Sequence, residues 1–96
     1  KLPKQEEYNF SALHLFPIQV KNRQKIYNLL NQNDIRVNVH YRPIHTQPFW
    51  QEKGFKVGLC PNSEFYYSRA ISLPIFYDLT DEMQNKVITV LQKLCL

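Results

Sequence analysis

The 96-residue chain is poor in the residues that mark several specialised classes of small protein. Its two glycines are too few for a collagen-like repeat or a glycine-rich phosphate loop. Its two cysteines, Cys60 and Cys95, lie far apart without a Cys-x-x-Cys pair, which disfavours a disulfide framework and favours reduced thiols in a cytoplasmic protein. No apolar run approaches the roughly 18 residues of a membrane span, so we expect no membrane segment.

The chain does contain enough apolar material for one folded domain. Hydrophobic residues make up 44% of the sequence and aromatic residues 14%, which excludes a disordered tail. The formal net charge is +4, and the basic residues are scattered along the chain. A nucleic-acid-binding protein usually concentrates positive charge on one face, so we interpret these residues as solvated surface charge and expect no nucleic-acid partner.

Hydrophobic periodicity and turn residues divide the chain into short elements. They predict, in order, a strand at 11–20, a helix at 21–33, a strand at 35–41, a helix at 61–70, a short extended segment at 71–74 and a helix that begins after Thr80. This order indicates an α/β fold (an α+β two-layer sandwich), a small sheet of about three strands with helices on one face. We expect residues 1–10 to be a linker or lead-in and residues 11–96 to form the domain.

Two of these elements have the clearest patterns. Between Ile35 and Tyr41, apolar residues alternate with polar ones, which is typical of a strand with one buried face. Thr80 precedes an acidic turn and a stripe of apolar residues at helical spacing, so it is expected to cap the last helix.

The segment from His40 to Trp50 is the candidate site, because it places polar and aromatic side chains in a proline-bounded loop after a buried strand. His40 and His45 are not accompanied by cysteines or carboxylates at zinc-binding spacing, so we expect no metal. Cys60 lies at a predicted helix start, but no nearby base would activate it. On residue types alone, an ordinary proline-stiffened loop whose aromatics complete the core is the favoured interpretation.

The motifs of this chain follow one another as in a known family. The run His-Tyr-x-Pro-x-His-x-Gln-Pro occupies His40 to Pro48, and Pro-x-x-Glu followed by Ile-Ser-Leu-Pro occupies Pro61 to Pro74. Leu-Thr-Asp-Glu follows at Leu79 to Glu82. In this order the motifs resemble the C-terminal domain of the DegT-type nucleotide-sugar aminotransferases, and the resemblance covers nearly the whole chain.

The resemblance implies the C-terminal small domain of a fold-type I aminotransferase that depends on pyridoxal phosphate (PLP). In that family the cofactor forms a Schiff base with a lysine of the larger N-terminal domain, and a nucleotide-linked keto sugar receives an amino group, usually from glutamate. No catalytic residue is expected in this chain. By the resemblance, Tyr41, His45, Gln47 and His40 bind substrate, and Pro43 and Pro48 shape the loop.

The start of the chain agrees with this interpretation, because its only methionine is Met83 and it begins at Lys1. We expect a C-terminal fragment of a bacterial, cytoplasmic enzyme, inactive alone, whose missing large domain binds PLP and which forms a homodimer at full length. The sequence is similar to those of enzymes that act on UDP-4-keto-6-deoxy sugars for cell-surface glycan biosynthesis. Its aromatic residues between Phe49 and Tyr77 are expected to include a docking face for the missing domain or the dimer mate.

A free-standing basic α/β module that binds nucleotide or RNA is the alternative. The main tyrosine cluster, Phe65 to Tyr67, lies in a predicted helix and does not alternate with basic residues along a strand, which argues against this alternative.

Overall fold

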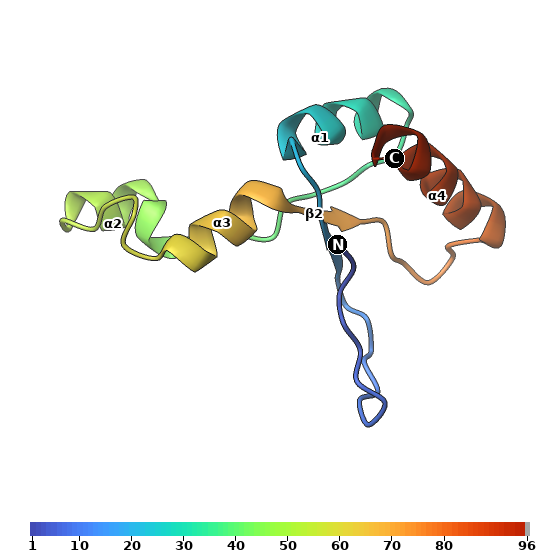
Figure 1. The fold of residues 1–96 in the computed structure, drawn as a ribbon, viewed down its shortest axis with the longest axis horizontal. Helices are drawn as coiled ribbons and strands as arrows, with labels where there is room; N and C mark the ends of the chain where they lie inside the picture. The colour runs from blue at the N-terminus through green and yellow to red at the C-terminus, as the bar shows by residue number, and fades with distance from the viewer. Residues whose placement is uncertain (96) are drawn as a thin grey trace.

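The computed structural model describes residues 1–95, so Leu96, the last residue of the expected domain, lies outside the described part. Along the chain the elements are β1 (Phe16–Gln19), α1 (Arg23–Gln32), the 3-10 turn η1 (Ile44–Thr46), α2 (Pro48–Glu52), α3 (Pro61–Arg69), β2 (Ala70–Leu73) and α4 (Asp81–Cys95). Figure 1 shows α1 and α4 beside the sheet, and α2 and α3 extending away from it. Among the helices within residues 1–95, none combines the length and apolar character that crossing a membrane requires.

The core lies between the two strands and the helices α1 and α4. β1 and β2 are antiparallel, with Phe16 opposite Leu73 and Gln19 opposite Ala70. Burying apolar surface here is the main stabilising contribution of the fold. The buried cluster consists of Ile18, Val20, Ile26, Leu30, Ile35, Val37 and Ile71, and Val87, Val90, Leu91 and Leu94 of α4 pack against it.

Helix α1 forms where the sequence predicts a helix, with slightly tighter limits. Ile26 and Leu30, one turn apart, form its buried face. At its end the side-chain amide of Asn33 donates to the carbonyl of Leu29 (2.8 Å), and Asp34 takes a left-handed conformation with φ of 57°. These turn residues stop the helix and direct the chain into the buried Ile35.

Helix α4 confirms the sequence prediction for the last element. The hydroxyl of Thr80 accepts a hydrogen bond from the backbone N–H of Met83 (3.2 Å), which satisfies a donor that the helix leaves free. Asp81 and Glu82 stand in the first turn and Lys93 in the last, as the helix dipole favours.

The predicted strand at 35–41 is wrong as a full sheet member: the sheet has two strands, not about three. Within residues 35–41, only Asn38 pairs with β2, through two backbone hydrogen bonds to Ser72 (2.8 and 3.2 Å). The predicted alternation of buried and exposed residues is nevertheless confirmed at the start of this segment, since Ile35 and Val37 are buried and Arg36 and Asn38 are exposed. The side chain of Asn38 accepts from the N–H of Val39 (2.8 Å), so a local bond replaces a continued ladder.

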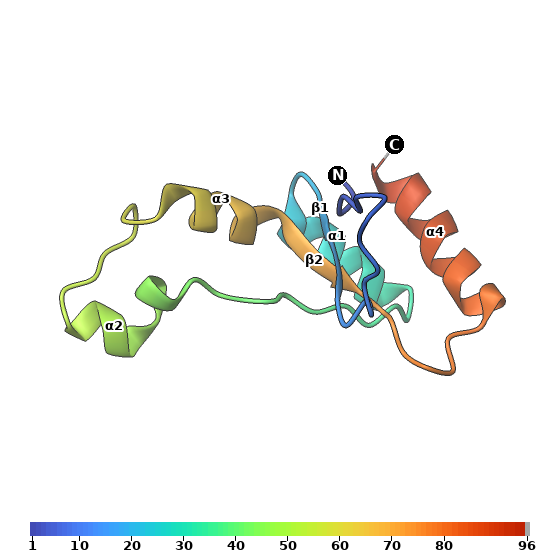
Figure 2. The same cartoon turned by 90° about the horizontal axis from the view of Figure 1, so that it is seen from below.

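The predicted strand at 11–20 is likewise shorter, because β1 begins only at Phe16. Leu13 has a φ of 49°, which interrupts extended backbone before β1. The first residues form an excursion that returns to the sheet (Figure 2). Backbone groups of Lys1 and Gln19 exchange two hydrogen bonds of 2.7 and 2.9 Å, so the first residue is held against the end of β1.

The expectation that the helices cover one face of the sheet is correct for α1 and α4 but wrong for α2 and α3. Residues 40–69 form an arm, which leaves the sheet, passes through η1 and α2, and returns through α3 to β2 (Figures 1 and 2). The Cα radius of gyration is 15.5 Å, whereas a compact chain of this length measures about 12–13 Å. The chain is therefore less compact than its composition suggests.

The core makes a prediction about stability. Leu30 is 0% exposed, so Leu30→Ala is expected to lower the free energy of unfolding by about 2–5 kcal/mol, because it leaves a cavity. Urea unfolding of the chain measures this. Ile88→Ala, at a half-exposed position of α4, is the matched control and should cost less than about 1 kcal/mol. Equal losses in the two variants would contradict the assigned core.

Candidate functional site

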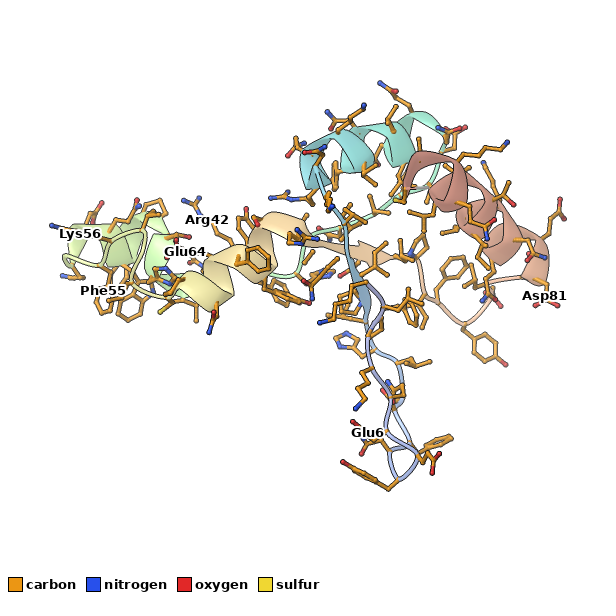
Figure 3. The ribbon with its side chains drawn as sticks, viewed as in Figure 1. Glu6, Arg42, Phe55, Lys56, Glu64 and Asp81 are labelled. Carbon is orange, nitrogen blue, oxygen red and sulfur yellow. The ribbon has the colours of Figure 1, made fainter. Side chains whose placement is uncertain are left out.

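The candidate loop from His40 to Pro48 forms the outgoing limb of the arm, and α3 forms the returning limb. Figure 3 shows Arg42 and Glu64 on the inner part of this arm and Phe55 and Lys56 near its outer end. The side chains of the loop therefore lie away from the core. Because the arm leaves the core, contacts between its own two limbs must hold it together.

His40 and Tyr41 lie at the base of the arm. The Nδ1 atom of His40 is 2.9 Å from the hydroxyl of Ser72, a buried residue of β2, so this ring is tied to the sheet. The ring of Tyr41 meets that of His40 edge to face, with 4.7 Å between centroids. Tyr41 remains 70% exposed, so its hydroxyl is available to a ligand or to another part of a longer protein.

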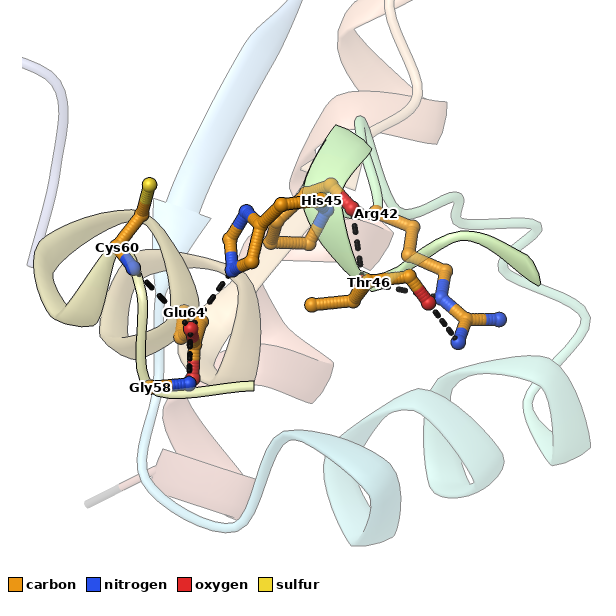
Figure 4. Close-up of polar contacts among 7 residues, drawn as sticks. Arg42, His45, Thr46, Gly58, Cys60 and Glu64 are labelled. Atoms are coloured by element: carbon orange, nitrogen blue, oxygen red, sulfur yellow. Dashed lines mark hydrogen bonds and ion pairs between the residues drawn. The ribbon is translucent and has the colours of Figure 1, made fainter. Parts of the chain in front are cut away.

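His45 lies further along the arm and is only 8% exposed. Its Nε2 atom is 2.7 Å from Oε1 of Glu64 on α3, so this bond joins the outgoing limb to the returning limb (Figure 4). The two residues are 19 positions apart in the sequence. A hydrogen bond of this length to a carboxylate belongs to the stronger, charge-assisted kind.

Glu64 receives more than this one bond. Its Oε1 also accepts from the backbone N–H groups of Gly58 (2.7 Å) and Cys60 (3.4 Å), which lie before α3. The hydrogen bond from His45 lowers the pKa of Glu64 below its ordinary value; desolvation opposes this, and the two backbone donors reinforce it. Glu64 is therefore held as a carboxylate that organises the loop on one side and His45 on the other.

The loop around His45 is fixed by a second set of bonds. The hydroxyl of Thr46 donates to the carbonyl of Pro43 (2.8 Å), and the guanidinium of Arg42 donates to the hydroxyl (3.2 Å) and the carbonyl (2.6 Å) of Thr46. Arg42 thus closes the turn it belongs to. Because Pro43 also restricts its own φ, the backbone that carries His45 has little freedom.

Gln47 and Pro48 begin the outer part of the arm. Gln47 is exposed, and its carbonyl accepts from the N–H groups of Trp50 and Gln51 at the start of α2. Pro48 occupies the first position of α2, where its missing N–H costs nothing. Beyond it, Trp50 meets Phe49 and Phe55 edge to face, each with 5.3 Å between centroids.

These contacts suit binding better than covalent chemistry. Within residues 1–95 no group of three or more histidine, cysteine, aspartate or glutamate side chains could hold a metal ion. All eight lysines are exposed. The loop offers exposed hydrogen-bonding side chains, Tyr41 and Gln47, on a stiff backbone.

The structure separates the residues that sequence analysis selected into two groups. His40 and Tyr41 touch at the base of the arm, whereas His45 contacts Glu64; within residues 1–95 no hydrogen bond or ring contact joins the two groups. Glu64 was not selected as a site residue. The available signal was its place in the Pro-x-x-Glu motif at a predicted helix start, where a carboxylate often accepts from nearby backbone N–H groups.

The sequence matches one protein family over almost its full length. The family model described as the DegT/DnrJ/EryC1/StrS aminotransferase family matches residues 1–92, which confirms the resemblance stated above. A solved DegT DnrJ EryC1 StrS aminotransferase from Brucella abortus is 30% identical, with a TM-score of 0.86 over 99% of this chain.

Two further solved structures carry information on activity. Helicobacter pylori PseC, an aminotransferase involved in the biosynthesis of pseudoaminic acid, is 31% identical, with a TM-score of 0.74 over 85% of this chain. A candidate sugar aminotransferase, Spr1654, from Streptococcus pneumoniae in its PLP form is 27% identical, with a TM-score of 0.79 over 90%. This chain spans only 24–26% of these three solved chains, and 23% of the curated relatives that it matches at 31% and 36% identity.

The lowered pKa of Glu64 makes stability depend on pH. Its carboxylate stabilises the fold above the ordinary glutamate pKa of about 4.3, and this contribution is lost as the pH falls through the lowered pKa. Glu64→Gln should therefore unfold at lower urea than the unsubstituted chain near neutral pH, and the difference should shrink below about pH 4. Urea midpoints across this range measure it.

Glu52→Gln is the matched control, since the side chain of this exposed glutamate of α2 makes no hydrogen bond or ion pair within residues 1–95. It should leave the midpoint nearly unchanged at each pH. A Glu64→Gln difference that stays constant from neutral to acidic pH would contradict the assignment.

Proposed function

The chain belongs to the DegT/DnrJ/EryC1/StrS aminotransferase family, and we propose that it is the C-terminal small domain of a longer PLP-dependent enzyme that aminates a nucleotide-linked keto sugar. The family match over residues 1–92 is the observation that carries this proposal. It also favours this function over a free-standing module for nucleotide or RNA. The amino donor is glutamate.

The substrate is a UDP-linked 4-keto-6-deoxy sugar, and the product serves cell-surface glycan biosynthesis. The likeness to Helicobacter pylori PseC supports this substrate class, because that aminotransferase is involved in the biosynthesis of pseudoaminic acid. The enzyme works in the bacterial cytoplasm. Two free, exposed cysteines, Cys60 and Cys95, suit such a reducing compartment.

The cofactor is held by the part of the enzyme that precedes this chain. PLP supplies the electron sink for amino transfer and needs a lysine placed against it. Every lysine of this chain is exposed, which supports a cofactor lysine in the large domain. The chain alone is therefore inactive as an aminotransferase.

The arm brings substrate-binding side chains to that active site. Tyr41, His45, Gln47 and His40 bind the sugar nucleotide, and Pro43 and Pro48 keep the loop stiff, which reduces the entropy lost on binding. Support comes from the way the loop is fixed: His40 bonds to Ser72 and His45 to Glu64, while Tyr41 and Gln47 remain exposed.

The arm is also a docking surface for the rest of the homodimeric enzyme. Exposed apolar side chains lie along its outer part and on the returning limb: Phe49, Trp50, Phe55, Val57, Leu59, Phe65 and Tyr66. Exposed apolar patches of this kind mark interaction sites. When the rest of the enzyme docks on this arm, it supplies apolar contacts to α2 and α3, which have no buried residue in this chain.

Substitution of the exposed loop residues tests the substrate role. In the full-length enzyme, Tyr41→Phe is expected to raise KM for the sugar nucleotide about tenfold, because it removes one hydrogen bond, and to leave KM for glutamate unchanged. Tyr8→Phe, in the exposed N-terminal excursion, is the matched control and should match the unsubstituted enzyme. Steady-state kinetics with each substrate varied in turn measure both.

The chain alone tests the cofactor assignment. Mixed with PLP and reduced with borohydride, it should retain no cofactor on any single lysine, as measured by peptide mass spectrometry. Stoichiometric labelling of one lysine, with amino transfer by the 96-residue chain, would overturn the proposal.

The docking surface predicts self-association of the isolated chain. Exposed aromatics should bind a hydrophobic dye and drive association at high concentration, and Phe49→Ser with Phe65→Ser should reduce both. Phe10→Ser, which removes an even more exposed ring outside the arm, is the control and should change little. Dye fluorescence and sedimentation velocity measure this. A monomer without dye binding would contradict the assignment.

A further inference from the structure

We propose that Glu64 is a positioning residue, which holds the imidazole of His45 with its hydrogen on Nε2 and thereby presents Nδ1 as a hydrogen-bond acceptor for a sugar hydroxyl. The identity of the ligand rests on the proposed function. The position of the hydrogen rests on the arm alone.

The contacts at Oε1 of Glu64 determine which partner donates. An ionised carboxylate only accepts hydrogen bonds, and backbone N–H groups only donate them. Oε1 already accepts from Gly58 at 2.7 Å. His45 Nε2, also at 2.7 Å, must therefore carry the hydrogen that it shares with this oxygen. The lowered pKa of Glu64 supports the ionised form.

The other ring nitrogen of His45 is available. In the neutral imidazole with hydrogen on Nε2, Nδ1 bears a lone pair and accepts a hydrogen bond. Within residues 1–95 every fully enclosed side-chain nitrogen or oxygen has a hydrogen-bond partner, whereas His45 Nδ1 has none. Although His45 is mostly buried, Nδ1 is therefore not fully enclosed.

The direction of the ring is set at both ends of the side chain. Glu64 fixes the Nε2 end, and the bonds among Arg42, Pro43 and Thr46 fix the backbone at η1. Figure 4 shows these two sets of contacts on either side of the imidazole. An acceptor with so little freedom loses little entropy when it binds a ligand.

This arrangement selects the kind of group that His45 can meet. An acceptor nitrogen pairs with a hydroxyl, which can donate, but not with a keto oxygen or a fully ionised phosphate, which only accept. The negative charge of Glu64 next to the ring further disfavours phosphate. We therefore assign His45 to a hydroxyl of the sugar or ribose and not to the diphosphate.

The hydrogen position is tested by long-range nitrogen–proton NMR of the imidazoles in the 96-residue chain, at a pH about two units above the ordinary histidine pKa of about 6.5. For His45 we expect Nε2 protonated and Nδ1 unprotonated, assigned by comparison with His45→Gln. Glu64→Gln should shift the signals toward a mixture of the two tautomers, because an amide can both donate and accept. Glu52→Gln is the control and should leave them unchanged.

The NMR measurement on the unsubstituted chain does not depend on whether any variant folds. A neutral His45 with its hydrogen on Nδ1 in the unsubstituted chain would overturn the proposal, as would identical signals in a folded Glu64→Gln chain. Glu64→Asp, which keeps the charge but shortens the side chain, should retain the Nε2 tautomer in part.

Kinetics of the full-length enzyme test the ligand. Glu64→Gln should raise KM for the sugar nucleotide about five- to tenfold with a smaller change in kcat, and Glu64→Asp should recover part of the loss. A substrate analogue that lacks the contacted hydroxyl should be insensitive to Glu64→Gln, and equal sensitivity of all deoxy analogues would overturn the ligand assignment. A full-length protein without aminotransferase activity would refute the proposed function, while the NMR result would still decide the role of Glu64.

Discussion

The arm depends on one oxygen atom, Oε1 of Glu64, which accepts from His45 on the outgoing limb and from Gly58 and Cys60 just before α3. Apolar burial holds the sheet, α1 and α4 together, but no residue of α2 or α3 is buried. Polar contacts therefore decide the course of the arm. Because Glu64 stays ionised near neutral pH, it can hold these donors together without changing its own charge.

The molecule is thus divided into a part stabilised by its core and a part stabilised by local bonds. Segments with few buried apolar contacts open with a lower free energy than the core does. In the arm this weakness coincides with exposed aromatic side chains on both limbs. The loop around His45 is rigid, whereas the exposed apolar surface of the arm is less stable. Both features suit a segment that presents side chains to a site completed by another part of a longer protein.

The sequence predicted correctly those features that depend on interactions between neighbouring residues. The end of α1 at Asn33 and Asp34 and the cap of α4 at Thr80 depend on neighbouring residues, and both were found from the sequence. The third strand failed because pairing depends on distant partners, and only Asn38 reaches Ser72. Glu64 was missed for the same reason, since its partner His45 lies 19 residues away. The family resemblance located the loop but carried no information on which groups hold it.

The edge-to-face cluster of Phe49, Trp50 and Phe55 has a practical consequence. Trp50 is the only tryptophan in the chain, and it lies at the outer end of the arm, remote from the core. Its indole emission therefore reports on the arm alone, and withdrawal of water from this cluster by another protein surface would move that emission toward the blue. Trp50 is thus an intrinsic fluorescent probe for the outer end of the arm.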